Sequence, residues 1–170
     1  QVTNRPVGIG KCIHILRHIC RPCRYRQRGG LPPGDRWCRQ PKKRLRMKNR
    51  LMRAPMGTNF GTTDGFGTDR DRQYYVERAK GGVAMVMTEA MVVTEGARNH
   101  RNSMCVFHDR FIPALATLVE AVKEHDCHIF GQISHRGGLL RRDVLNMEPV
   151  GPSPWRNPNT GDVVRQLEVS

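Results

Sequence analysis

The feature that most constrains the fold is an alternation of apolar runs and helical segments between residues 49 and 133. Residues 83–87 form an unbroken apolar run, which is typical of a strand buried on both faces. Residues 49–56 predict a short strand that stops at Pro55, because proline cannot donate to a central ladder. Residues 127–133 predict a third strand. The order strand, helix, strand, helix, strand indicates βαβ units and a parallel sheet.

The two intervening helices carry recognisable signals at their ends. Thr68 is the expected N-cap of a helix over 69–80, with Asp69 and Asp71 in its first turn, where negative charge suits the helix dipole. The glycine pair 81–82 ends this helix. Asp109 is the expected cap of a second helix, which ends near residues 125–126. Its apolar residues repeat every three or four positions and form one stripe: Phe111, Ile112, Leu115, Leu118, Val119 and Val122.

Charge divides the chain into two parts. The whole sequence has 29 Lys and Arg against 15 Asp and Glu, a formal net charge of +14, and most of the excess lies in residues 1–46. This segment has little apolar sequence, so we expect it to be disordered or a non-native translated stretch. Zinc binding and nucleic-acid binding through the basic run 42–46 remain alternatives. The zinc alternative would draw on Cys12, His14, His18, Cys20, Cys23 and Cys38. Residues 47–170 are nearly neutral and predict one globular unit.

Several classes of protein are excluded or disfavoured by the sequence. No run of about 18 apolar residues occurs, so no membrane-spanning helix is expected. No secretory signal pattern is present, which favours a reducing, cytoplasmic setting. Neither a dinucleotide-binding glycine pattern after the first strand nor a P-loop occurs. His100 and His108 lie in a polar stretch and are not expected to be metal ligands, so no metal site is predicted in residues 47–170.

The carboxyl ends of the three strands predict the position of a site. In parallel α/β sheets, ligands bind at these ends. They carry the segment 55–57, the pair Glu89 and Ala90, and Gln132 followed by His135. Gln132 is a polar amide in an apolar strand and needs a buried partner. We expect Glu89 to pair with an arginine, while His135 either supports a bound group or only shapes its loop.

The motifs in this order resemble those of the old yellow enzyme family over residues 47–170. The version of the first loop with Met56-Gly57-Thr58-Asn59 is similar to NADH:flavin oxidoreductases that include 2,4-dienoyl-CoA and 2-enoate reductases. The matching motifs are Lys48-Asn49-Arg50, Ala54-Pro55-Met56-Gly57-Thr58-Asn59, Asp64-Gly65, Thr68-Asp69, Tyr74-Tyr75, Glu77-Arg78-Ala79-Lys80-Gly81-Gly82, Thr88-Glu89-Ala90, Asp109-Arg110-Phe111-Ile112-Pro113 and Gln132-Ile133-Ser134-His135.

This resemblance implies an α/β fold, a (β/α)8 TIM barrel with FMN at the carboxyl ends of its strands. It also implies hydride transfer from NADH or NADPH, through FMN, to a small-molecule enone or enoyl substrate. Gln132 would hydrogen-bond the pyrimidine edge of the flavin, and Asn59 would lie near the substrate. Amides that donate to the flavin carbonyls stabilise the charge of its reduced form. The implied FMN-binding residues are Ala54, Pro55, Met56, Gly57, Ala90 and Gln132.

The resemblance covers about the first three strands and two helices of the barrel. The histidine pair or His/Asn pair that binds substrate from the fourth strand, and the phosphate-binding loops of the last strands, have no counterparts here. We therefore expect the isolated chain to be poorly stable, to bind FMN weakly and to be inactive. Its open sheet edges predict self-association. The alternative function is a non-catalytic basic protein that binds nucleic acid or zinc through residues 1–46, although nucleic-acid binding is not favoured.

Overall fold

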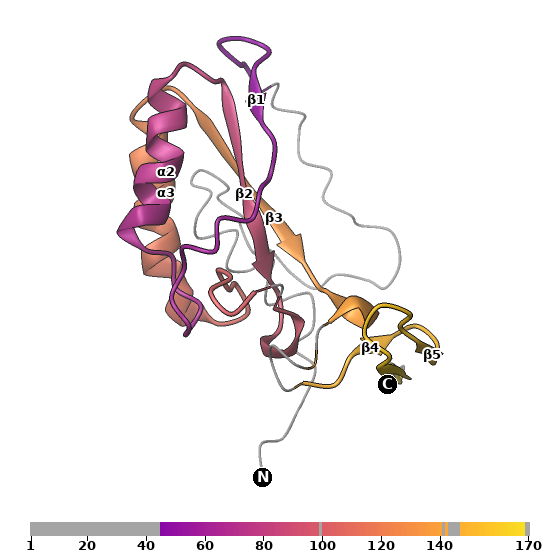
Figure 1. Cartoon of the computed structure of the whole chain (residues 1–170). Coiled ribbons are helices and arrows are strands. Elements are labelled where there is room, and N and C mark those ends of the chain that lie inside the picture. Colours follow the sequence, from indigo (N-terminus) through magenta and orange to yellow (C-terminus); the bar gives the residue numbers. More distant parts are fainter. Residues whose placement is uncertain (1–44, 99, 141, 143–146, 169–170) are drawn as a thin grey trace, which may run out of the picture.

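The computed structural model describes residues 45–98, 100–140, 142 and 147–168. Three strands, β1 (Met52–Arg53), β2 (Met85–Val92) and β3 (His128–Ser134), form a parallel sheet in the order β1-β2-β3. The helices α2 (Asp69–Lys80) and α3 (Ile112–Lys123) connect them and lie side by side on one face of the sheet (Figure 1). This arrangement confirms the predicted order of βαβ units.

The sheet contains an irregularity that decides which side chains share a face. Met87 pairs with Phe130, but the next pair is Ala90 with Gln132, so β2 takes one more residue than β3 between these points. Because side chains alternate along a strand, one extra residue reverses the alternation beyond it. Val86 before the bulge and Met91 after it both belong to the hydrophobic core. Ala90 is thereby placed on the same face as Gln132.

Helix α2 begins with the predicted cap and α3 does not. The Thr68 side chain accepts a hydrogen bond from the Asp71 backbone, and the Asp71 side chain accepts one from the Thr68 backbone, which completes a capping box. Gly82, with φ of +95°, follows α2 and takes the left-handed conformation. The predicted Asp109 cap is wrong. A 3-10 helix (Asp109–Phe111) comes first, and the imidazole of His108 accepts from Arg110 N at its start.

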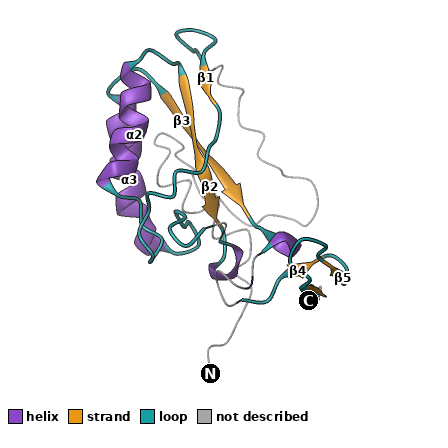
Figure 2. Ribbon diagram, in the orientation of Figure 1, coloured by secondary structure: helices purple, strands orange, loops and turns teal. Residues whose placement is uncertain are grey.

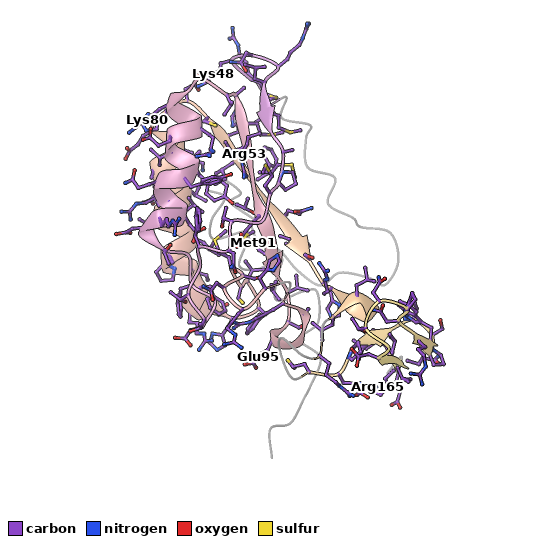
Figure 3. The ribbon with its side chains drawn as sticks, in the orientation of Figure 1. Lys48, Arg53, Lys80, Met91, Glu95 and Arg165 are labelled. Carbon is purple, nitrogen blue, oxygen red and sulfur yellow. The ribbon has the colours of Figure 1, made fainter. Side chains whose placement is uncertain are left out.

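The hydrophobic core lies between the sheet and the two helices, where side chains fill the interface (Figure 3). The predicted stripe on α3 contributes Leu115, Leu118 and Val122, all buried. On the opposite face of the sheet, no helix or strand among the described residues covers the surface (Figure 2). Large apolar side chains are consequently exposed on and beside β1 and β3: Leu51, Met52, Met56 and Phe130.

The bounds of two strands and the structure of the tail differ from those predicted. The first strand is only two residues long rather than 49–56, because Asn49 turns back on the backbone of Leu51 and Pro55 lacks a donor. The second strand runs to Val92, because it continues past its bulge along β3. The aperiodic tail contains a small second sheet in the order β4-β6-β5, formed by β4 (Val150–Gly151), β5 (Trp155–Arg156) and β6 (Val163–Gln166).

Short 3-10 turns follow the second and third strands. One spans Glu95–Ala97 after β2, and another spans Gly137–Leu139 after β3. Cys105 pairs with Val92 in an isolated parallel bridge, so the polar stretch after β2 returns to the sheet. Within the described parts of the chain, no helix combines the length and apolar character needed to cross a bilayer.

Candidate functional site

The carboxyl ends of the three strands bring most of the predicted site residues to one edge of the sheet. Ala90 and Gln132 are direct register partners on adjacent strands, so their side chains leave the same face. Both are half-buried. The backbone N–H of Gln132 donates to Thr88 Oγ1 over 3.2 Å, which fixes β3 against the bulge. The pair is therefore held rigidly at the face that lacks helices.

The segment after β1 presents its residues to the surface. Ala54 and Gly57 are exposed, Pro55 is half-buried, and 61% of Met56 is accessible. Asn59 is also exposed and has φ of +56°, a left-handed conformation that asparagine tolerates better than most residues. An exposed methionine among accessible backbone offers an apolar platform for a flat ring.

Glu89 holds this segment against the sheet. Its side chain is 3% exposed, and Oε2 accepts from Thr58 N at 2.7 Å and from the Thr58 hydroxyl at 2.8 Å. Oε1 accepts from Met104 N at 3.1 Å. Among the described residues, the expected pairing of Glu89 with an arginine is not found, because backbone and hydroxyl donors satisfy the carboxylate instead. Glu89 joins three segments that are distant in sequence.

Asp71 is a second buried acid beside the same hydroxyl, and the sequence did not single it out as a site residue. It is 1% exposed, and its Oδ1 lies 3.0 Å from Thr58 Oγ1. Oδ2 accepts from Thr68 N at 3.0 Å. Burial raises the pKa of Asp71, and the nearby charge of Glu89 adds to the rise. The only sequence signal was the Thr68-to-Asp71 capping spacing.

Arg53, Tyr74 and Tyr75 make the hydrogen bonds on the helix side of Glu89. The Arg53 guanidinium donates to Met87 O at 2.8 Å and to the Tyr74 hydroxyl at 2.7 Å. The Tyr75 hydroxyl accepts from Glu89 N at 2.7 Å, at the β2 bulge. Burial raises the pKa of Tyr75 to about 12. These contacts lie on the helix-covered face, so they support the site from behind.

The exposed edge carries the polar and apolar groups that suit an FMN ring. Among the described residues, nothing bonds to the side-chain amide of Gln132, so it remains available for the polar edge of a ligand. Its register partner Ala90 has a small side chain that leaves room for a ring. Met56 and Pro55 would supply apolar contact. These residues could hold a flavin, with the amide fixing its orientation.

The histidines do not build a second centre. His135 Nδ1 accepts from Gly137 N at 3.0 Å, which favours its role in loop structure, and burial lowers the His135 pKa. Across residues 45–98, 100–140, 142 and 147–168, no group of three or more His, Cys, Asp or Glu side chains could hold a metal ion. The cysteines and histidines of residues 1–46 lie outside the described residues, so the zinc site remains a prediction. Nucleic-acid binding through the basic run 42–46 also remains a prediction.

The parallel strands and the two helices that connect them define part of a (β/α) barrel. The model of the NADH:flavin oxidoreductase / NADH oxidase family matches residues 42–168. The chain belongs to this family, which confirms the predicted old yellow enzyme resemblance. FMN and NADH or NADPH are the predicted cofactors, and they are the cofactors of this family.

Named relatives agree with this assignment. The chain is 31% identical to an NADH oxidase of Thermoanaerobacter brockii over 128 residues, covering 74% of this chain and 20% of the relative. It is 35% identical to an NADPH dehydrogenase of Listeria welshimeri over 112 residues, covering 65% of this chain and 32% of the relative. The chain thus spans between a fifth and a third of these curated relatives.

Solved structures support the predicted barrel fold. The old yellow enzyme homologue from Zymomonas mobilis superposes with a TM-score of 0.66 at 26% identity, covering 72% of this chain and 37% of that one. A 2-naphthoyl-CoA reductase in complex with 2-naphthoyl-CoA gives a TM-score of 0.68 at 26% identity, covering 72% and 21% of the two chains. The described sheet and helices are therefore part of a TIM barrel.

Proposed function

We propose that the strand-end face of this sheet binds FMN, and that the whole protein is an FMN-dependent NAD(P)H oxidoreductase that reduces activated alkenes of the enoate or dienoyl type. The observation that carries the proposal is the register pair of Ala90 and Gln132 on the helix-free face, with Met56 exposed in the segment that follows β1. When bound, FMN would accept hydride from the nicotinamide and pass hydride to an electron-poor double bond.

The chain's own residues have separate roles in this proposal. The Gln132 amide hydrogen-bonds the polar edge of the ring and fixes its orientation. Ala54, Pro55, Met56, Gly57 and Ala90 line the ring and exclude water from it, and Asn59 lies on the substrate side. The alkene preference is supported by the reductase name of the 2-naphthoyl-CoA relative, which is a statement about that protein.

An FMN titration of the 170-residue chain tests the binding proposal. Flavin fluorescence and visible absorbance report the affinity, with circular dichroism on the same sample to verify folding. Gln132→Leu should weaken FMN binding about threefold to tenfold, because it removes one hydrogen bond to the ring. Gln73→Leu is the matched control, since Gln73 is exposed on α2 away from this face. Equal affinity for the two variants would contradict the role of Gln132.

The alkene proposal has its own test. The whole protein, loaded with FMN, should oxidise NADH or NADPH faster when an α,β-unsaturated carbonyl compound is added, with loss of the enone absorbance. A saturated ketone of the same carbon skeleton is the matched control substrate. Cofactor oxidation that is unaffected by the enone would reject the alkene as substrate while leaving FMN binding intact.

We further propose that copies of this chain associate and that the protein is cytoplasmic. The support for association is the pair of sheet edges, β1 and β3, that no described strand covers, with exposed Met52 beside one and Phe130 beside the other. The support for a reducing compartment is that Cys105 and Cys127 are both free thiols.

A further inference from the structure

Two buried carboxyl groups share one hydroxyl at the centre of the molecule. Thr58 Oγ1 lies 2.8 Å from Glu89 Oε2 and 3.0 Å from Asp71 Oδ1. The two acidic residues are 3% and 1% exposed. In the described part of the chain, none of the ion pairs includes either acid. Two negative charges so close together and so poorly solvated would repel strongly.

Counting hydrogens shows where a proton must lie. The Thr58 hydroxyl has one hydrogen, and it can donate to only one of the two acids. Both oxygens of Glu89 already accept backbone N–H groups, from Thr58 and from Met104, as an ionised carboxylate does. The shorter hydroxyl contact is also to Glu89. The remaining 3.0 Å contact, from Asp71 Oδ1 to Thr58 Oγ1, is then attractive only if Asp71 supplies the hydrogen.

We propose that Glu89 is a positioning residue for the flavin-side segment 56–59, and that Asp71 holds it in place as a neutral acid, donating to Thr58, which donates to Glu89. This inference rests on the proposed FMN site, because it assigns the group that sets the geometry of that site. Glu89 precedes Ala90 directly and binds Thr58, which follows Gly57. One carboxylate therefore fixes two parts of the ring-binding face relative to each other.

The positive φ of Asn59 also depends on Glu89. Glu89 Oε2 also lies 3.4 Å from Asn59 N, so the carboxylate holds the backbone at the point where it turns into the left-handed region. Such a conformation persists only when its surroundings stabilise it. Release of Glu89 should let this segment relax and change the position of Asn59 before any substrate is bound.

The surroundings of Asp71 determine the pH dependence. The charged and titratable groups that face it are Glu89 from β2, Tyr75 from its own helix and, behind Tyr75, Arg53 from β1. Burial raises the pKa of Asp71 above its ordinary value of 3.8. A raised pKa in the folded state means that the stabilisation is complete below 3.8 and declines as pH rises through the folded pKa. The segment should therefore loosen on the alkaline side of that pKa.

The test compares amide hydrogen exchange and carboxyl titration in the full 170-residue chain. In the wild type, the carbon-13 resonance of the Asp71 carboxyl should titrate above the ordinary aspartate pKa of 3.8. Asp71→Asn should keep protection of the Thr58 and Met104 amides, because its NH₂ can replace the proposed O–H donor. It should also abolish the pH dependence of that protection.

Glu89→Gln should behave differently. An NH₂ group would face one of the backbone N–H donors, so we expect protection of the Thr58 and Met104 amides to fall about tenfold to hundredfold. Glu77→Gln is the matched control on the exposed side of α2, where the same change should have no effect. FMN affinity should fall in Glu89→Gln and persist in Asp71→Asn.

Three results would overturn the inference: an ordinary titration of Asp71 in the wild type, a loss of protection in Asp71→Asn equal to that in Glu89→Gln, or exchange in Glu89→Gln equal to that in Glu77→Gln. If Glu89→Gln does not fold, the wild-type titration and the exchange of Asp71→Asn still test whether Asp71 is a neutral donor. If the wild type binds no FMN at all, the proposed function fails, while the exchange data continue to judge the positioning role separately.

Discussion

Replacement of Tyr75 by phenylalanine tests how the helix layer supports the strand-end site. Tyr75 is fully buried on α2, and its hydroxyl accepts from the backbone N–H of Glu89 at 2.7 Å. Phenylalanine keeps the ring and its packing but removes this acceptor. The N–H of Glu89 lies in the β2 bulge, so ladder pairing with β3 cannot replace the lost bond there.

The size of the effect follows from leaving a buried donor without a partner. We expect Tyr75→Phe to lower the free energy of unfolding by about 1–3 kcal/mol. Tyr74→Phe is the matched control, because Tyr74 is half-buried and its partner Arg53 also bonds to Met87 O. That control should lose less than about 1 kcal/mol. Urea unfolding followed by helical circular dichroism measures both, and the denaturant slope should not change.

Alkaline pH supplies a second signature of the same residue. The pKa of Tyr75 rises by burial from 10.0 to about 12. Between these values the unfolded chain has lost the tyrosine proton while the folded chain retains it. Wild-type stability should therefore fall as pH rises through this window, by at most about 1.4 kcal/mol per pH unit. Phenylalanine has no such proton, so the difference in free energy of unfolding between wild type and Tyr75→Phe should become smaller as pH rises.

Two outcomes would refute this reasoning. If Tyr75→Phe is no less stable than Tyr74→Phe at neutral pH, the Glu89 backbone bond does not support the bulge. If the difference in free energy of unfolding between wild type and Tyr75→Phe is the same at every pH, burial does not raise the pKa of Tyr75. Either result would also weaken the view that α2 fixes the strand-end face.

Two other predictions concern the first loop and the sheet edges. Gly65→Ala should destabilise the chain by more than about 1 kcal/mol in urea unfolding, because φ is +92° and an added Cβ would lie 2.5 Å from Cys105 Sγ; Gly82→Ala, also at positive φ but with open space around it, should cost less. Self-association should appear as a concentration-dependent sedimentation coefficient, and Phe130→Lys on β3 should reduce it, whereas Lys123→Glu on exposed α3 should not. A monomer at every concentration would contradict the predicted self-association.

Local patterns in the sequence were sufficient for the element order and most of the layer arrangement. The apolar run 83–87, the helical stripe ending in Leu118 and Val122, and the Thr68 cap each depend on neighbours a few residues away. Such signals can be recognised without knowledge of the tertiary structure. The family motifs similarly named Ala90 and Gln132, and the structure places these two side by side, although their contact with FMN remains a prediction.

Only the tertiary structure decided how the strand-end site is supported. The bulge between Met87 and Ala90 is invisible in the sequence, because it arises from pairing with β3. Likewise, Glu89 accepts from Thr58 and Met104, 31 and 15 residues away, instead of an arginine. A buried carboxylate takes whichever donors the fold brings to it, and those donors are backbone groups with no residue-type signature. Sequence therefore determined which elements form, while long-range packing determined the partners of the buried charges.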